Sequence, residues 1–315
     1  MTADFAALGL RVGHATDAPG GTGVTVVRGD GPFRAAAAIL GRATGTRELD
    51  ALSPAHLVDR VDAIVLTGGS AYGLGAADGV MKWMEERGRG FDVRVGVVPI
   101  VPAAVIFDLA PLGSHLARPT PAMAYEACER AAARFEEGSV GAGTGATVGK
   151  GAGPERAMKG GVGAHVERAG SLAVGALAVV NALGDVRDGD GRIIAGARAD
   201  GGGFVDLARA MAQGIAAGPR APVGNTTLAV VATNAALSRL ELAQVARAAE
   251  AAYARRITPV GTSFDGDVIF AVGAIEGPPA AGIQVEALAV RALEMAVERA
   301  VRAATGRDGI PGLAD

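Results

Sequence analysis

The residues with the clearest chemical potential are Asn225 and Thr226, which stand in a Gly-Asn-Thr-Thr segment before an apolar run, residues 228–232. If the chain breaks between them, Thr226 becomes a new N-terminus that carries a hydroxyl nucleophile and an amine base in one residue. An ordinary strand entry accounts for the same residues, because Gly and Asn tolerate left-handed backbone and Thr favours strands. The segment therefore indicates either a turn or a self-cleavage site of an amide-bond hydrolase.

A glycine-rich segment, residues 141–151, places Lys150 near its end. A phosphate-binding Walker loop requires Gly where this chain has Thr144, and Ser or Thr where it has Gly151, so we reject that interpretation. What remains is a loop that presents one ammonium group. Lys150 is then either a site residue or an ordinary surface lysine.

Three further polar residues end or follow apolar segments. Asp265 and Asp267 flank a single glycine, and they are either solvated turn acids or carboxylates that orient a nearby amine or hydroxyl. A calcium loop would need additional ligands and a terminal Glu that the segment lacks. Asn181 ends the run 172–180 and is either a turn residue or a donor to an oxyanion.

The segment Gly68-Gly-Ser-Ala-Tyr72-Gly follows an apparent strand, residues 62–66. Its Ser70 does not fit a Gly-x-Ser-x-Gly nucleophile elbow, so a strand-to-helix turn lining a pocket is the better interpretation. We expect no metal and no cofactor, because the four histidines lack the spacing of metal ligands. They are His14, His56, His115 and His165.

Composition narrows the class of protein. The chain has 315 residues, half of them hydrophobic, and apolar segments recur throughout without a linker, so we expect one domain, residues 1–315. With 30 basic and 33 acidic residues, no basic tract and 4 % aromatics, nucleic acid is not expected as a partner. Cys128 stands alone and is expected to be a buried core residue.

We expect neither a signal peptide nor a membrane span, and therefore a cytoplasmic setting. Strand-like runs alternate with Ala-rich helical stretches, which indicates an α/β protein. Helices are predicted over 121–137, with Thr120 as N-cap, over about 238–255, with a Ser238/Glu241 capping box, and over about 285–304. Strands are predicted over 226–233 and 268–272.

The motifs, taken as a set, resemble those of L-aminopeptidase/D-amino-acid esterases and β-aminopeptidases, including the nylon-oligomer (6-aminohexanoate oligomer) endo-hydrolases. The resemblance covers nearly the whole chain. The segments that carry it are Val12-Gly-His14-Ala-Thr-Asp17, Leu66-Thr-Gly-Gly-Ser-Ala-Tyr72-Gly, Val-Ile-Phe107-Asp-Leu, Lys150 after its Gly loop, Val-Val-Asn181, Gly-Asn225-Thr226-Thr, Ala232-Thr233-Asn234 and Ser-Phe-Asp265-Gly-Asp267.

The resemblance implies an αββα four-layer sandwich of the N-terminal-nucleophile hydrolase type, shared with ornithine acetyltransferase. It implies self-cleavage into residues 1–225 and 226–315 and assembly of processed protomers as a homotetramer. It also implies Thr226 as nucleophile, Asn181 near the oxyanion and Lys150 in the site. The pair Asp265 and Asp267 would hold Thr226.

One position departs from the family pattern. The nylon-oligomer branch is expected to have tyrosine where this chain has Phe107, and Tyr72 is a candidate substitute for the missing hydroxyl. Peptides and linear amides, cut at an end or internally, both stay open as substrates. An acyltransferase of the ornithine acetyltransferase type and a non-catalytic, unprocessed homologue are the alternatives to a hydrolase.

Overall fold

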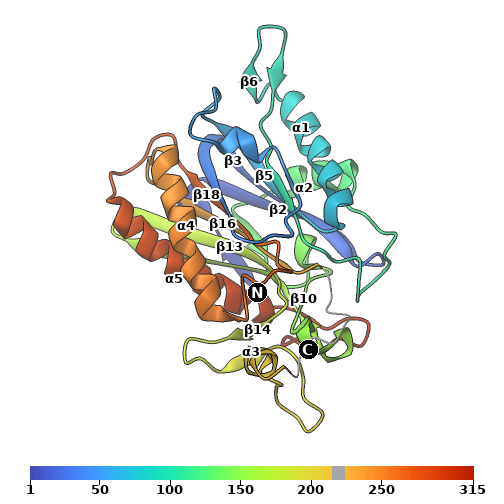
Figure 1. Cartoon of the computed structure of the whole chain (residues 1–315). Coiled ribbons are helices and arrows are strands. Elements are labelled where there is room, and N and C mark those ends of the chain that lie inside the picture. Colours follow the sequence, from blue (N-terminus) through green and yellow to red (C-terminus); the bar gives the residue numbers. More distant parts are fainter. Residues whose placement is uncertain (215–223) are drawn as a thin grey trace.

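The computed structural model describes residues 1–214 and 224–315, and its centre is one large mixed sheet (Figure 1). Within the described residues the strands follow the order β12-β13-β16-β18-β3-β5-β8-β4, with β2 paired to β3 outside this path. The strands are β2 (Leu10–Asp17), β3 (Thr22–Ile39), β4 (Thr46–Arg47), β5 (Val61–Thr67), β8 (Ala103–Val105), β12 (Gly161–Ala169), β13 (Leu172–Asn181), β16 (Thr226–Thr233) and β18 (Val268–Gly273).

The long strand β3 belongs to both halves of this sheet. Its C-terminal part, from Arg34 to Ile39, pairs antiparallel with β18. Its N-terminal part pairs with β2 and β5, and the register with β5 shifts between Arg28 and Phe33. Because an irregularity of this kind bends and twists a strand, β3 passes from one half-sheet to the other.

Alternating side chains show that the two half-sheets stack face to face. In β16, Leu228 and Val230 join a core that also contains Ile64 and Leu66 of β5. The intervening residue Ala229 faces the opposite way, into the core beneath two helices. Successive strand residues point to opposite faces, so each half-sheet has one inner and one outer apolar face.

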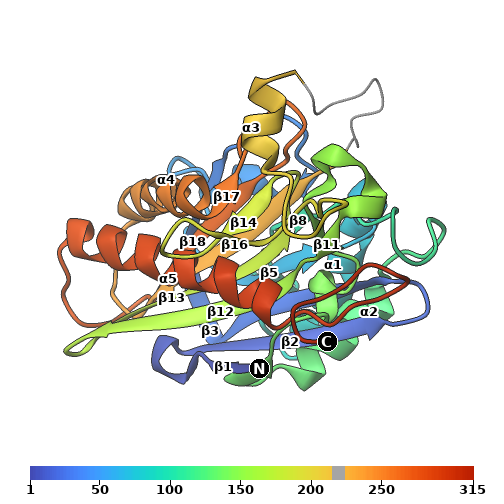
Figure 2. The same cartoon turned by 90° about the horizontal axis from the view of Figure 1, so that it is seen from below.

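Two pairs of helices cover the outer faces (Figures 1 and 2). The α4 and α5 helices pack on the half-sheet of β12, β13, β16 and β18, and α1 and α2 pack on the half-sheet of β2, β3 and β5. The helices are α1 (Ala77–Glu85), α2 (Pro121–Arg130), α3 (Leu207–Ala212), α4 (Arg239–Arg256) and α5 (Gly282–Arg302). The predicted αββα four-layer sandwich is confirmed.

One helix prediction is wrong at its C-terminal end. Thr120 caps α2 as expected, its Oγ1 accepting the Met123 N–H, but the helix ends at Arg130 and not at Glu137. Residues Arg134–Glu136 form β9, which pairs with β1 (Thr2–Asp4). The Phe135 ring packs edge-on against Phe5, with ring centroids 5.0 Å apart. Pairing with the N-terminal strand therefore overrides the helical pattern of this segment.

The other helix predictions hold. Ser238 and Glu241 form the capping box at the start of α4, and α5 begins three residues before the expected position. The turn after β5 is a short 3-10 helix, Ser70–Ala76, that leads into α1 as expected. Cys128 is buried in α2, where burial raises the pKa of its thiol to about 12.

Short strands gather mainly at the end of the molecule that carries α3 in Figure 1. They are β10 (Thr147–Val148) with β11 (Met158–Lys159), and β14 (Asp185–Arg187) between β15 (Ile193–Ala195) and β17 (Ile257–Thr258). At the opposite end a hairpin of β6 (Phe91–Asp92) and β7 (Val97–Val98) projects outward.

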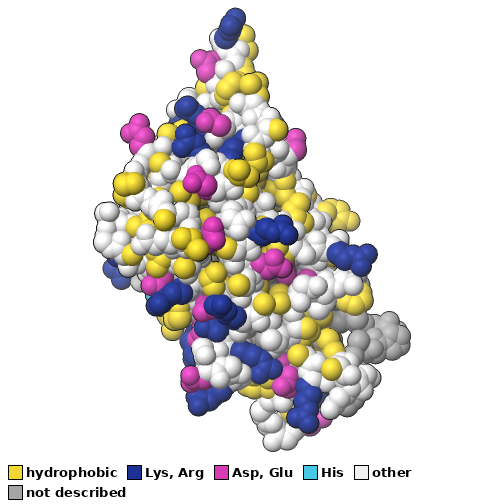
Figure 3. Space-filling view, turned by 60° about the vertical axis from the view of Figure 1, so that its left-hand side comes forward, with side chains coloured by type: hydrophobic (Ala, Val, Ile, Leu, Met, Phe, Trp, Pro, Cys, Tyr) yellow, Lys and Arg dark blue, Asp and Glu magenta, His cyan; other side chains and the backbone are white. Residues whose placement is uncertain are grey.

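The visible surface carries mixed charge. On the face seen in Figure 3, basic and acidic side chains are interspersed with apolar ones, and neither sign gathers into a patch. In the two described ranges, every helix is too short or too polar to span a bilayer.

Candidate active site

Thr226 lies at the beginning of β16, directly opposite Asn181 at the end of the antiparallel strand β13. Both residues are buried. The apolar runs that form these strands are central in the sheet, so their ends are held by packing on both faces. The tertiary structure thus brings together two residues that are 45 positions apart in the chain.

Hydrogen bonds hold the Asn181 side chain on both sides. Its Oδ1 accepts from Lys150 Nζ at 2.7 Å and from the Thr147 N–H at 3.1 Å. Its Nδ2 donates to the Phe107 carbonyl oxygen at 3.0 Å. An amide nitrogen has two N–H groups, so among the described residues one of them is left for another acceptor.

Lys150 is a buried residue and not a surface lysine. Its ammonium also donates to the backbone oxygen of Asn181 at 3.0 Å. Burial lowers the pKa of Lys150 to about 7, while the nearby Asp265 carboxylate acts in the opposite direction. The group therefore supplies a cation whose charge depends on pH close to neutrality.

The segment Asp265-Gly266-Asp267 runs beside the residues that precede and begin β16. Asn225 and Asp265 form a parallel β-bridge, and the Gly266 N–H donates to the Asn225 carbonyl oxygen at 2.7 Å. Asp267 Oδ1 accepts the Thr227 N–H at 2.6 Å. A Cβ atom at position 266 would lie 2.7 Å from Thr226 Oγ1, so the glycine makes room for that hydroxyl.

Both aspartates are buried, which excludes the interpretation as solvated turn acids. Asp265 Oδ2 accepts the Thr262 N–H at 2.7 Å, and burial is the main cause that raises its pKa. Burial, reinforced by the neighbouring charge of Asp265, raises the pKa of Asp267 to about 8. Two carboxylates this close resist simultaneous ionisation, so Asp267 can hold a proton at neutral pH.

The two residues proposed from sequence for the substrate pocket lie in different surroundings. Phe107 contacts the segment before the Asn225–Thr226 bond, since a Cβ at Gly224 would lie 2.2 Å from Phe107 Cγ. The Tyr72 ring is 66 % exposed and has the Arg118 guanidinium 3.9 Å from its centroid. Phe107 therefore lies beside the candidate site, whereas the exposed Tyr72 ring lies against Arg118.

Sequence reasoning missed Gly266 and Thr147, because both contribute backbone N–H groups and not side chains. Glycine between two aspartates could have been a signal for close approach. No residue type signals the Thr147 N–H, which faces Asn181 only because β10 lies against β13.

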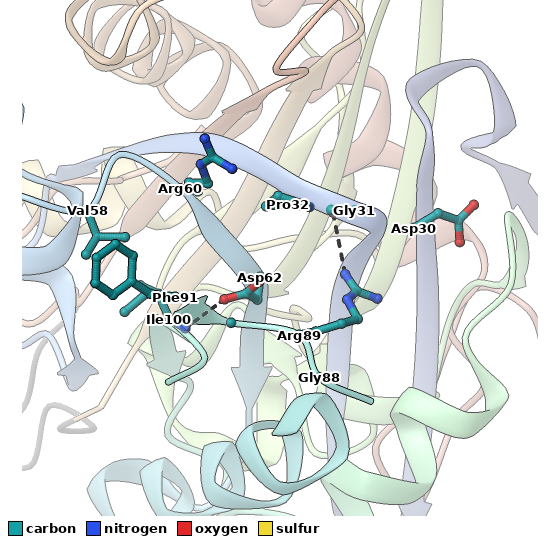
Figure 4. A pocket seen from close by; sticks show the side chains of 11 residues that line it. Asp30, Gly31, Pro32, Val58, Arg60, Asp62, Gly88, Arg89, Phe91 and Ile100 are labelled. Carbon is teal, nitrogen blue, oxygen red and sulfur yellow. Dashed lines mark hydrogen bonds between the residues drawn. The ribbon is translucent and has the colours of Figure 1, made fainter. Parts of the chain in front are cut away.

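A separate cavity of about 290 Å³ lies at the N-terminal end of β5, remote from the Thr67 end of that strand (Figure 4). Its lining includes Asp62, Arg89, Phe91 and Ile100, and none of the site residues predicted from sequence. In the part of the chain that the structure describes, no group of three or more His, Cys, Asp or Glu side chains is arranged to hold a metal ion.

Solved structures with similar architecture identify the class of fold. A β-aminopeptidase of Burkholderia sp. matches with a TM-score of 0.70 at 20 % identity, over 97 % of this chain and 88 % of that chain. The L-aminopeptidase D-Ala-esterase/amidase of Ochrobactrum anthropi, described as a variant of the N-terminal-nucleophile hydrolase fold, matches with a TM-score of 0.69 at 20 % identity, over 99 % and 90 % of the two chains. The fold is that of N-terminal-nucleophile hydrolases.

Sequence comparison then places the chain within this class. It belongs to Peptidase family S58, whose model matches residues 7–312, and it is a hydrolase acting on amide bonds. An uncharacterized aminopeptidase of Mycobacterium tuberculosis is 44 % identical over 87 % of this chain and 83 % of the relative. A 6-aminohexanoate-oligomer endohydrolase of Kocuria sp. is 34 % identical over 84 % of this chain and 72 % of the relative.

Proposed function

We propose that the protein is a self-processing amide hydrolase whose nucleophile is the N-terminal Thr226 formed by cleavage of the Asn225–Thr226 bond. The observation that supports this most directly is the position of Thr226 between two sets of groups. Asn181 and Lys150 lie on the β13 side, and Asp265, Gly266 and Asp267 lie on the β18 side.

In the self-cleavage step, Thr226 Oγ1 attacks the Asn225 carbonyl carbon, and the Gly266 N–H stabilises the negative charge that develops on the carbonyl oxygen. The C–N bond then breaks, and the hydroxyl proton passes to the departing nitrogen. The product is an ester between the Asn225 acyl group and Thr226 Oγ1. Water hydrolyses this ester to leave a carboxylate at Asn225 and a free amine and hydroxyl at Thr226.

Cleavage would give subunits of residues 1–225 and 226–315 that stay together. The smaller subunit contributes β16 and β18, which lie in the sheet between β13 and β3 of the larger one. It also contributes α4 and α5, whose apolar faces form a core with β13. Separating the subunits would expose this core to water, which is strongly unfavourable.

In turnover, the free Thr226 amine accepts the hydroxyl proton, and Oγ1 attacks the carbonyl carbon of a substrate amide. The second N–H of Asn181 is the proposed donor to the resulting oxyanion. The leaving amine takes the proton as the C–N bond breaks, and water then releases the acyl group from Thr226. The amine and the hydroxyl are thereby regenerated.

Lys150, Asp265 and Asp267 complete the proposed catalytic set. Lys150 holds Asn181 through two hydrogen bonds and adds positive charge beside the oxyanion position. Asp267 anchors the first residues of β16 through the Thr227 N–H. The proposed role of both carboxylates is to orient the new amine. Carboxylates raise the pKa of a nearby amine and an ammonium group lowers it. The two aspartates and Lys150 would therefore have opposite effects on the pKa of the Thr226 amine.

We propose peptides and linear amides as the substrate class. The relatives that support this choice carry the names of an aminopeptidase and of a 6-aminohexanoate-oligomer endohydrolase. The Phe107 ring contacts Gly224, so an apolar surface becomes available if residues 224–225 move away after cleavage. A linear methylene chain would fit such a surface.

The experiment that tests the nucleophile is the intact mass of the purified protein under denaturing conditions. We expect two fragments, residues 1–225 and 226–315, and a single uncut chain for Thr226→Ala. The matched control is Thr227→Val, because the buried Thr227 Oγ1 has no hydrogen-bond partner among the described residues. Processing of Thr226→Ala would reject the proposal.

Hydrolysis is then measured on amino-acid p-nitroanilides and on a linear 6-aminohexanoate oligomer, with and without an added amine. Release of the free acid in both conditions supports a hydrolase, whereas a new amide formed only with the amine would indicate acyl transfer. Assembly as a homotetramer is likewise a proposal, which light scattering of the processed protein tests. A cytoplasmic location stays a prediction from sequence.

A further inference from the structure

Two buried charged residues that the mechanism does not use lie behind Asn181. Lys159 stands on β11 and Asp108 directly follows Phe107, and both are buried. Burial lowers the pKa of Lys159 to about 7, with Arg307 acting in the same direction and the negative charge of Asp108 in the opposite one. A buried charge without catalytic use needs another reason, because removing it from water is costly.

Lys159 contacts the peptide unit that donates to Asn181. It lies directly opposite Thr147 in the β10–β11 ladder. Its Nζ donates to the Ala146 carbonyl oxygen at 2.7 Å and to the Thr144 carbonyl oxygen at 2.9 Å. The Ala146 carbonyl and the Thr147 N–H belong to one peptide unit, so a chain of hydrogen bonds runs from Lys159 through that unit to Asn181 Oδ1. Such chains polarise and strengthen their members.

Asp108 has the corresponding role on the other side of the amide. Its carboxylate accepts from Thr22 Oγ1 at 2.6 Å and from the Gly69 N–H at 2.6 Å. The adjacent Phe107 carbonyl accepts from Asn181 Nδ2. Gly145 packs closely against Asp108, since a Cβ there would lie 2.6 Å from Asp108 Cβ.

We propose that Lys159 and Asp108 are positioning residues that hold the amide of Asn181 with its oxygen toward Lys150 and its nitrogen toward the oxyanion position. This inference rests on the proposed function, in which Asn181 donates to the oxyanion. A flipped amide would place its N–H groups against the Lys150 ammonium and the Thr147 N–H, donors facing donors without an acceptor. Lys159 and Asp108 hold the Thr147 N–H and the Phe107 carbonyl oxygen in the positions that exclude this flip.

The test is a double-mutant cycle on amide hydrolysis by the processed protein. Lys159→Met and Asp108→Asn are each made alone and in the Asn181→Ala background, and kcat and KM are measured at high enzyme concentration. We expect each single change to lower kcat about tenfold to hundredfold with KM within about threefold, since small misplacement of a catalytic group has effects of this size. In the Asn181→Ala background the further loss should be below about threefold, because the group they position is absent.

Asp62→Asn is the matched control for a buried aspartate. Asp62 accepts the Ile100 N–H at 2.9 Å and lines the separate cavity, whose lining contains none of the proposed site residues (Figure 4). The kcat of Asp62→Asn should stay within about twofold of the kcat of the parent protein. Equal fold losses with and without Asn181 would overturn the positioning role, and so would failure of both Lys159→Met and Asp108→Asn to fold when Asp62→Asn folds. Full activity of Asn181→Ala alone would instead reject the oxyanion role that the proposed function gives to Asn181.

Discussion

The backbone N–H of Gly266 donates a 2.7 Å hydrogen bond to the carbonyl oxygen of Asn225, the carbonyl of the peptide bond that precedes Thr226. A donor in this position stabilises negative charge on that oxygen when the carbonyl is attacked. Because Gly266 is held by the parallel bridge between Asn225 and Asp265, the donor is in place before any reaction begins. The uncut chain thus already contains one element that the proposed self-cleavage requires.

Gly266→Ala should slow self-cleavage at least tenfold. The added Cβ would lie 2.7 Å from Thr226 Oγ1 and 2.5 Å from the Ala43 carbonyl oxygen, so the hydroxyl or the donor must move. A time course of fragment formation on denaturing gels measures the effect. Gly75→Ala is the control, because its Cβ would meet nothing within 4 Å. Normal processing of Gly266→Ala would show that close approach at this position is unimportant.

Gly224→Ala should also impair self-cleavage, for a different reason. Gly224 has a φ of +103° and its Cβ would lie 2.2 Å from Phe107 Cγ, so alanine must shift the chain next to the scissile bond. Gly202→Ala shares the strained backbone, with a φ of +90°, but meets nothing within 4 Å. The intact masses of both variants after equal incubation separate the steric effect from backbone strain. Equal processing of the two would refute the role of the Phe107 contact.

Asn181→Ala should lower kcat about 100- to 1000-fold, the usual effect of losing one oxyanion donor. The Thr147 N–H loses its acceptor, which costs about 1–3 kcal/mol of stability for a buried group, so the protein should still fold. Steady-state hydrolysis and a thermal melt check the two parts. Near-normal turnover would exclude Asn181 from the oxyanion site.

Asp267→Asn should change how stability depends on pH. The pKa of Asp267 is raised to about 8 in the folded chain, against about 3.9 when unfolded. Between these values the folded state holds a proton that the unfolded state has lost, so this group's contribution to stability falls as pH rises from about 4 to about 8. We expect a shallower decline of the melting temperature over that window in Asp267→Asn.

The measurement is made in a Thr226→Ala background, so that both proteins stay uncut and no new amine titrates. The asparagine side chain introduced by Asp267→Asn would retain an oxygen able to accept the Thr227 N–H, which isolates the effect of the charge. An unchanged pH slope would mean that Asp267 is ionised throughout this range.

Local patterns in the sequence predicted most of the central elements. The apolar runs of β13 and β16, the capping box of α4 and the strand-to-helix turn after β5 each have a signature in a short stretch of sequence. The exception is the segment after Arg130, where a pairing with residues 2–4 decides the conformation. Such long-range pairing leaves no local signal.

The sequence by itself determined the residue types of the candidate site, since a Thr, an Asn, a Lys and two Asp each end or follow a recognisable apolar or Gly-rich segment. Only the tertiary structure decided which of them meet. Thr226 faces Asn181 because β16 pairs in register with β13. Lys150 is buried and donates to Asn181, and the Gly266 N–H donates to Asn225, because the chain fold packs these segments together. These are contacts between distant parts of the chain, and their energies depend on burial that no single segment can specify.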